Sequence, residues 1–404
     1  MNINQTGQAY STKIQDKTFV VPQVNIPVAA EIDTDKDFFL SKEEVANYVT
    51  QGGEKPEASI LDDQTNEFQC AVAAAPNPYA AGYHSFDALI ADFDKLTQEN
   101  PNYVKKEILG KSPEGRDLVA YKFSEGAQGD TSAKLGVVIT GCHHAREWMT
   151  VEAPLAFGKS LLDGIASDSA KQQRLHESEV WIVPCANPDG YEYSRTTDSW
   201  WRKTRRPIEE TGCPNLKGNK GVDPNRNYWD GKPEHFELYR PAGDTPCSTR
   251  DDFGDGKTSD NPKADTYRGP SGGSEPEVQA MLNLELNPAN NIKGVLDYHS
   301  YGDMILYPYG SKELPADRLE IYRDIGSKMN ATLGNTFDLK PSSDLYPTSG
   351  GSNDLHEANG ILGLTLEIGR SFQPPASQIP KATAAITPAN LVFIDEIKSR
   401  YPQA

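Results

Sequence analysis

Two residues that can hold a metal ion, His144 and Glu147, stand three positions apart in the stretch GCHHAREW at residues 141–148. A sharp turn of the chain there would bring an imidazole nitrogen and a carboxylate oxygen to one point. Zn²⁺ accepts both kinds of ligand, and a catalytic zinc site uses about three protein ligands and a water molecule. The spacing is also common by chance. The alternative interpretation is therefore a surface histidine and glutamate near the start of a helix. Further ligands elsewhere in the sequence would argue against it.

The elements around this stretch predict how the two side chains are positioned. Residues 135–140 are apolar and predict a buried strand that ends just before His144, and a helix is expected over residues 151–164. Further strands are expected over residues 179–184, 292–298 and 361–366, a hairpin within 103–122, a turn at 187–190, and helices over 85–96, 275–286, 316–333 and up to Tyr401. This alternation predicts an α/β fold with a mixed, largely parallel central sheet flanked by helices.

Three residues that can bind a metal or a proton follow the ends of predicted strands. His144, His299 and Glu367 each come just after an apolar run. In an open α/β sheet, ligands bind beyond the carboxyl ends of the strands. The sequence therefore predicts one crevice that collects all three side chains, with His143 as a rival ligand to its neighbour His144.

Several motifs in a fixed order resemble the zinc carboxypeptidases of the pancreatic carboxypeptidase A/B type, and the resemblance covers residues 77–404. The matching segments are HAREW at 144–148, WRKTR at 201–205, GVDPNRN at 221–227, GVLDYHSY at 294–301, YPTSGGSND at 346–354 and TLEI at 365–368. The resemblance implies a zinc carboxypeptidase-like fold with a single catalytic domain.

The resemblance also implies a reaction. One Zn²⁺ per chain would be bound by His144, Glu147 and His299, with a position left for a water molecule that the metal activates. Glu367 would be the general base, and Arg202 would stabilise the oxyanion of the tetrahedral intermediate. The protein would then be a metallocarboxypeptidase that hydrolyses the C-terminal peptide bond of peptides and proteins.

Recognition of a free C-terminus requires groups that bind a carboxylate. By the same resemblance, Arg226 would supply a bidentate fork, with Asn225 and the hydroxyl of Tyr346 as further donors. Asp223 would orient the ring of His144, and Arg146 would line the cleft. Without the resemblance, Arg202 could belong to a solvated basic loop, residues 225–227 could form an ordinary turn, Tyr346 could pack on a surface, and Glu367 could be structural.

The preference for a C-terminal side chain depends on Asn353, which the resemblance places at the base of the specificity pocket, with Gly310 in its wall. Asn353 is neither acidic nor apolar, so basic side chains are disfavoured. We expect neutral, apolar or aromatic C-terminal residues, and a broadened or polar preference is the rival. Alternative functions are a zinc amidohydrolase acting on cell-wall peptides or acyl amino acids, and a non-catalytic binding module.

The first 76 residues predict an appendage or pro-segment, and residues 71–78 predict a linker where a cut could separate it from the catalytic domain at 77–404. Residues 33–44 resemble an EF-hand loop, with Asp33, Asp35, Asp37, Phe39 and Glu44 at the positions that would bind Ca²⁺. Phe38 departs from the pattern, because glycine normally makes the turn there. A solvated acidic turn is therefore the alternative to a calcium site.

Composition excludes some partners. The chain has 58 acidic and 40 basic side chains and a net charge of −18, which disfavours nucleic acids and anionic membranes. We expect a secreted monomer, although the sequence shows no signal peptide. Of five cysteines, Cys213 and Cys247 bracket a long loop and could form a disulfide; Cys142 and Cys185 could pair or remain buried thiols, and Cys70 has no assigned partner.

Overall fold

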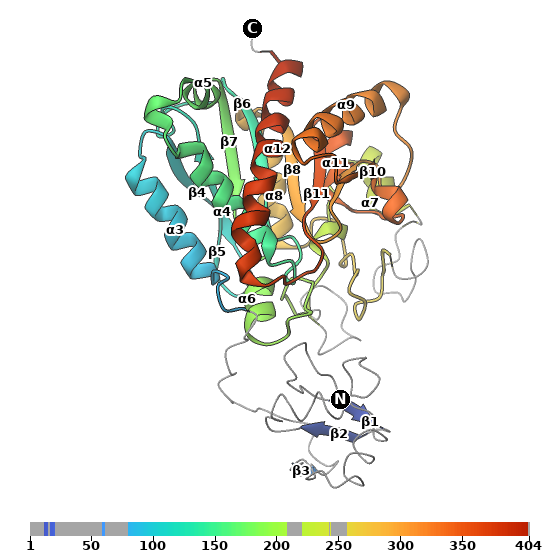
Figure 1. Ribbon diagram of the computed structural model, residues 1–404. Coiled ribbons are helices and arrows are strands. Elements are labelled where there is room, and N and C mark those ends of the chain that lie inside the picture. The colour runs from blue at the N-terminus through green and yellow to red at the C-terminus, as the bar shows by residue number, and fades with distance from the viewer. Residues whose placement is uncertain are drawn as a thin grey trace. The chain divides into compact units, whose positions relative to one another are not determined.

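The computed structural model (Figure 1) describes residues 80–207, 220–241, 243 and 257–402, and the backbone of three short strands near the N-terminus. The chain divides into two compact units, Met1–Ala73 and Ala74–Ala404. In the first unit, β2 (Lys17–Val20) pairs antiparallel with β1 (Thr12–Ile14) and β3 (Ser59–Ile60). The EF-hand-like segment and Cys70, Cys213 and Cys247 lie outside the described residues. Calcium binding and the disulfide therefore stay predictions.

The second unit is built on an eight-stranded sheet in the order β10-β9-β11-β8-β6-β7-β5-β4. Its strands are β4 (Val104–Lys111), β5 (Asp117–Phe123), β6 (Leu135–Thr140), β7 (Ser178–Val183), β8 (Ile292–His299), β9 (Met304–Tyr307), β10 (Asp338–Pro341) and β11 (Leu362–Glu367). The central strands β11, β8, β6 and β7 are mutually parallel, whereas antiparallel pairs join them to the outer strands. The predicted mixed, largely parallel sheet is confirmed.

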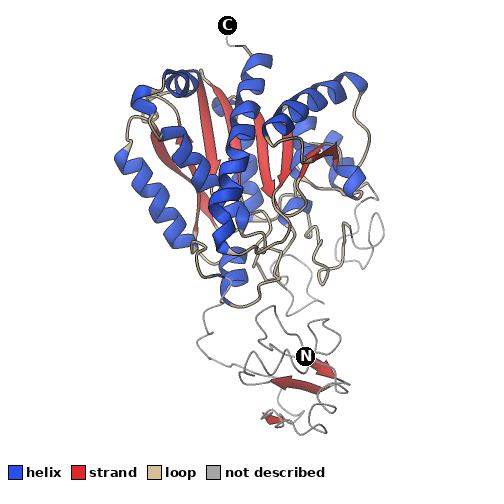
Figure 2. Ribbon diagram, viewed as in Figure 1, coloured by secondary structure: helices blue, strands red, loops and turns tan. Residues whose placement is uncertain are grey.

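Helices cover both faces of this sheet, as Figure 2 shows. They are α3 (Phe86–Glu99), α4 (Met149–Leu162), α5 (Ser169–Glu177), α6 (Pro188–Thr196), α7 (Phe236–Tyr239), α8 (Pro276–Glu285), α9 (Ala316–Thr332), α10 (Ser342–Leu345), α11 (Ser352–Ala358) and α12 (Ile379–Arg400). Side chains along β6 alternate between two cores, because neighbouring residues of a strand face opposite ways. Val137 and Ile139 pack with α3, α4, α9 and α12, and Val138 packs with α8 and α11.

Local sequence explains most element boundaries. The Ser85 side chain accepts a hydrogen bond from the backbone N–H of Ala88 and caps α3, as predicted. The turn expected at residues 187–190 is wrong. Asn187 caps α6 by accepting from the N–H of Gly190, and Pro188 occupies the first helical position, where no N–H is needed. Helix α5 and strands β9 and β10 have no counterpart in the expected elements. Within the described part of the chain, none of the helices combines the length and apolarity needed to cross a membrane.

Candidate metal and catalytic site

The carboxyl ends of β6, β8 and β11 bring the predicted site together. Glu367 and His299 are the last residues of β11 and β8 and are direct partners in the strand register. Strand β6 pairs with β8 on its other side, and the turn after β6 carries His144. Gly141 begins this turn, and a Cβ atom there would lie 2.2 Å from the carbonyl oxygen of Thr150. Only glycine fits at that close approach.

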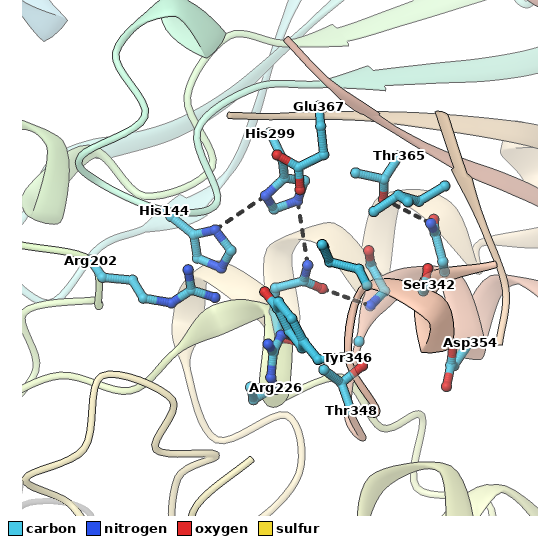
Figure 3. Close-up of a pocket in the computed structure, with 16 residues that line it drawn as sticks. His144, Arg202, Arg226, His299, Ser342, Tyr346, Thr348, Asp354, Thr365 and Glu367 are labelled. Atoms are coloured by element: carbon cyan, nitrogen blue, oxygen red, sulfur yellow. Dashed lines mark hydrogen bonds between the residues drawn. The ribbon is translucent and has the colours of Figure 1, made fainter. Parts of the chain in front are cut away.

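His144, Glu147 and His299 form a compact, buried group. Nδ1 of His144 lies 2.7 Å from Oε1 of Glu147, and Nδ1 of His299 lies 3.1 Å from Oε2 of the same carboxylate. The two Nδ1 atoms are themselves 3.1 Å apart. Each residue is at most 3% exposed. Figure 3 shows the two imidazole rings facing each other at one end of the cleft.

This group fits a zinc ion. Tetrahedral coordination with Zn–N distances of about 2.0–2.1 Å would place two nitrogen ligands about 3.3 Å apart, close to the observed separation. Burial disfavours the charged form of His299, but the facing carboxylate of Glu147 outweighs burial and raises the pKa of this histidine. The site therefore stabilises positive charge. Among the described residues, this is the one group of three or more His, Cys, Asp or Glu side chains with ligand atoms close enough to share an ion.

Asp223 connects the metal group to Arg202. Its Oδ1 lies 3.1 Å from Nε2 of His144, and its Oδ2 accepts from Nε of Arg202 at 2.9 Å. Asp223 also caps the short 3₁₀ turn Pro224–Arg226 by accepting from the N–H of Asn225. Burial would raise the pKa of this carboxyl, but the charges of Arg202, His144 and Arg226 together outweigh burial and hold the pKa well below its usual range. One ionised carboxylate thus fixes both a histidine ring and a guanidinium.

Glu367 faces the same cleft and has an unusual ionisation. Removal from water, together with the negative charge of Glu147, raises the pKa of Glu367 to about 7, although His299 and Arg202 act in the opposite direction. A carboxylate with a pKa near neutrality can both accept and return a proton at physiological pH. Its position opposite His299 makes it the residue best placed for proton transfer in this cleft.

The wall beside the metal group carries the residues expected to bind a carboxylate. Nε and Nη1 of Arg226 donate to the carbonyl oxygens of Lys257 and Asn225, which fixes the plane of the guanidinium. The ring of Tyr346 lies 6.0 Å from that guanidinium. Nδ2 of Asn225 lies 3.4 Å from Nε2 of His299. Its Oδ1 accepts a hydrogen bond from the backbone N–H of Ser352 at 2.9 Å. Tyr346 and Arg226 are seen together in Figure 3.

These groups line one cleft. The lining residues are His144, Arg202, Asn225, Arg226, His299, Leu306, Ser342, Leu345, Tyr346, Thr348, Gly351, Ser352, Asn353, Asp354, Thr365 and Glu367. The cleft therefore contains the expected substrate residues Asn225, Arg226, Tyr346 and Asn353. Arg146 does not line it: Nη1 of Arg146 contacts Asp265 and the carbonyl oxygen of Trp200.

Other candidates are separated from the metal group. Nε2 of His143 lies 2.8 Å from the hydroxyl of Tyr228, and the ring stacks on His299. Burial lowers the pKa of His143 to about 4, and this rival ligand is not part of the group whose ligand atoms lie close enough to share an ion. Cys142 and Cys185 follow the neighbouring strands β6 and β7, and both are buried free thiols.

The sequence reasoning missed the side chains at the inner end of the cleft, among them Ser342, Thr348 and Thr365. One signal was available for Thr365. It stands two positions before Glu367, and residues two apart in a strand share a face. Ser342 and Thr348 come from segments near Tyr346 whose path into the cleft no local pattern indicates.

Comparison with known proteins agrees with this geometry. A family model described as zinc carboxypeptidase matches residues 89–386. Carboxypeptidase A1 of Rattus norvegicus is 32% identical over 333 residues, which cover 79% of this chain and 72% of that relative. Carboxypeptidase A2 of Rattus norvegicus is 32% identical over 284 residues, which cover 69% of this chain and 60% of that relative, less than two thirds of its length. The crystal structure of carboxypeptidase A from Helicoverpa armigera has a similar fold, with a TM-score of 0.65 at 24% identity over 89% of this chain and 86% of that one.

Proposed function

The chain belongs to the zinc carboxypeptidase family, and from this premise we propose that it is a zinc-dependent exopeptidase that hydrolyses the C-terminal peptide bond of peptides and proteins. One observation supports this function above all others. His144 and His299, two of the three residues of the metal group, line the same cleft as Arg226. A metal group beside a fixed carboxylate receptor is the arrangement that a C-terminal peptidase requires.

His144, Glu147 and His299 would hold one Zn²⁺, which would supply a Lewis acid and lower the pKa of a bound water molecule. Glu367 accepts a proton from the attacking water and later returns it to the leaving amine. Arg202, whose guanidinium is fixed by Asp223, stabilises the negative charge that develops on the carbonyl oxygen. Each of these roles is assigned to a side chain that lines the cleft.

Cleavage of only the last residue depends on how the C-terminal part of the substrate, beyond the scissile bond, is bound. Arg226 binds the terminal carboxylate of the substrate through its guanidinium, assisted by Asn225 and the hydroxyl of Tyr346. Because backbone carbonyls already hold the plane of Arg226, little side-chain entropy is lost when the substrate binds. A peptide without a free carboxylate leaves this guanidinium without its anionic partner.

The test compares peptides that share one sequence and end in a free carboxylate or an amide, using the intact protein and protein nicked by a protease within residues 71–79. We expect loss of one C-terminal residue from the free peptide, no loss from the amide, and recovery of activity when zinc is restored after chelation. Equal cleavage of both peptides would contradict a role for Arg226 in carboxylate recognition. No release by either protein form would contradict the proposed function.

The alternative substrate class, cell-wall peptides or acyl amino acids, is an additional arm of the same assay. The carboxylate-binding residues Asn225, Arg226 and Tyr346 favour peptides with free C-termini over these substrates. Faster hydrolysis of an acyl amino acid than of the matched peptide would favour the amidohydrolase. For side-chain preference we propose neutral C-terminal residues, because Asn353 lines the cleft where a basic side chain would need an acid.

Residues 1–76 are proposed as a pro-segment or appendage that binds Ca²⁺ through residues 33–44, on a protein that is secreted and monomeric. The support is the spacing of Asp33, Asp35, Asp37 and Glu44 and the acidic composition. Calorimetric titration with Ca²⁺, repeated with Asp33→Asn, tests the binding. An increase in turnover after a cut at residues 71–79 tests the inhibitory role.

A further inference from the structure

Beside the metal group and the carboxylate-binding residues, the cleft is lined by polar as well as apolar side chains. Two leucines, Leu306 and Leu345, are its apolar side chains. The remaining surface includes Ser342, Thr348, Asn353 and Thr365. A pocket built to hold an aliphatic or aromatic side chain would expose apolar atoms on most of its wall. This composition indicates recognition by hydrogen bonds.

Asn353, at the start of α11, lines this pocket and carries one buried polar atom without a hydrogen-bond partner among the described residues. The side chain is 6% exposed. Its Nδ2 donates to Oγ1 of Thr365 at 2.8 Å, whereas its Oδ1 is buried and has no hydrogen-bond partner among the described residues. A buried carbonyl without a partner costs free energy comparable to a lost hydrogen bond. A ligand that donates a hydrogen bond to Oδ1 recovers this cost.

Thr365 supplies the opposite kind of group. Its hydroxyl oxygen accepts from Asn353, and a hydroxyl that accepts still has its own proton to donate. The two serine hydroxyls nearby are already committed as donors. Ser342 donates to the carbonyl oxygen of Tyr307, and Ser352 donates to Asp297. Asn353 and Thr365 therefore present an acceptor and a donor side by side.

Charge in the pocket wall does not favour an ionised side chain. Both oxygens of Asp354 are engaged, one by the N–H of Gly310 and one by the hydroxyl of Ser311. Asp297 is behind Ser352, fully buried, and does not line the cleft. A glutamate would therefore approach two acidic groups, whereas a lysine would meet one carboxylate in the wall, Asp354, whose two oxygens already accept hydrogen bonds.

We propose that Asn353 and Thr365 select a C-terminal residue whose side chain carries a primary carboxamide, glutamine or asparagine. The carboxamide N–H donates to Oδ1 of Asn353, and its carbonyl oxygen accepts from the hydroxyl of Thr365. If the Asn353 amide is rotated by a half-turn, its oxygen and nitrogen exchange places. The ligand still pairs with it, because a carboxamide carries both a donor and an acceptor. This inference rests on the proposed exopeptidase function and narrows its neutral preference to polar residues.

The first experiment measures kcat/KM of the zinc-loaded full chain for peptides that differ only in the last residue. Two pairs match in size and differ in polarity: glutamine with methionine, and asparagine with leucine. We expect at least one carboxamide residue to be preferred over its apolar partner by about tenfold or more, because a site that hydrogen-bonds its substrate discriminates against analogues that leave polar groups unpaired. Peptides ending in lysine, glutamate and phenylalanine complete the series.

The second experiment removes each polar group without changing its size. Thr365→Val and Asn353→Leu should each lower the glutamine-to-methionine ratio of kcat/KM by about tenfold, since each removes one hydrogen-bonding partner. Thr387→Val, on α12 outside the cleft, should leave the ratio unchanged. A purely structural effect would lower kcat/KM for both peptides equally and leave their ratio constant.

The outcomes separate this inference from the function on which it rests. Cleavage of methionine, leucine, phenylalanine, lysine or glutamate peptides as fast as the carboxamide peptides, or faster, overturns the carboxamide assignment and leaves the exopeptidase intact. Release of no residue from any peptide, by either the intact or the nicked chain, contradicts the exopeptidase itself. If a pocket variant fails to fold, the peptide series with the unsubstituted chain decides alone.

Discussion

Nε2 of His144 lies 3.1 Å from Oδ1 of Asp223, so the ring nitrogen opposite the metal-facing Nδ1 is held by a buried carboxylate. The same carboxylate accepts from Nε of Arg202 through its other oxygen. A carboxylate behind a metal-binding histidine fixes the ring and increases its basicity. In the proposed mechanism, Asp223 therefore links metal affinity to the position of the guanidinium of Arg202.

Replacing Asp223 with asparagine should weaken zinc binding by about 10- to 100-fold, the usual effect of removing a carboxylate behind a histidine ligand. The variant also leaves the buried charge of Arg202 without its anionic partner, so kcat should fall as well. Competition with a chromophoric chelator measures the affinity. Asp338→Asn, which changes an exposed carboxylate, is the matched control. Unchanged zinc affinity in a folded Asp223→Asn protein would contradict this role.

Glu367→Gln should separate metal binding from turnover. The amide keeps the size of the side chain but cannot accept a proton, so kcat should fall by about 100-fold or more. The zinc content should stay at that of the unsubstituted chain, because Glu367 lies outside the group of His144, Glu147 and His299. Metal analysis and peptide assays measure the two quantities. Glu313→Gln, at an exposed position, is the control. Near-normal turnover in the Glu367→Gln variant would rule out Glu367 as the base.

The pH dependence of kcat/KM should show the ionisation of Glu367. Burial raises the pKa of this carboxyl to about 7, and only the ionised form can accept a proton. Activity should therefore fall as the pH drops through this pKa, by about tenfold per unit well below it. A bound dication favours the ionised form and moves the limb below about pH 7. Assays at low substrate concentration between about pH 5 and 8 test this, and a flat profile would contradict it.

Sequence patterns predicted the parts of the site that depend on strand ends. Strong apolar runs identified β6, β8 and β11, and the rule that ligands bind at carboxyl ends placed His144, His299 and Glu367 in one crevice. In the structure Glu367 and His299 are register partners, and both line the same cleft as His144. Neighbouring histidines were harder to separate. Only the packing of His143 against Tyr228 and His299 distinguishes it from the ligand His144.

Features made by distant segments were not predictable. Thr365 acquires its role from a contact with Asn353 in another element, and Arg146 turns to Asp265 instead of lining the cleft. Short elements such as β10 have little apolar pattern of their own. Strand β10 is stabilised instead by its pairing with β9. The segment at residues 187–190 has typical turn residues, yet the cap of Asn187 and the first-turn proline start a helix.

Replacing Gly350 tests whether the segment that carries Tyr346 and Asn353 must pack closely against Arg226. Its φ is +70°, and a Cβ atom there would lie 2.1 Å from the carbonyl oxygen of Arg226. Gly350→Ala should therefore displace the loop, raise KM several-fold, and destabilise the fold by more than the strain of a positive φ alone. Gly360→Ala isolates that strain, because Gly360 has φ +72° with nothing within 4 Å of an added Cβ. This control should lose about 1–2 kcal/mol of stability and keep its KM. Thermal unfolding and peptide kinetics measure both effects, and equal losses of stability with unchanged KM in the two variants would show that the loop tolerates separation from Arg226.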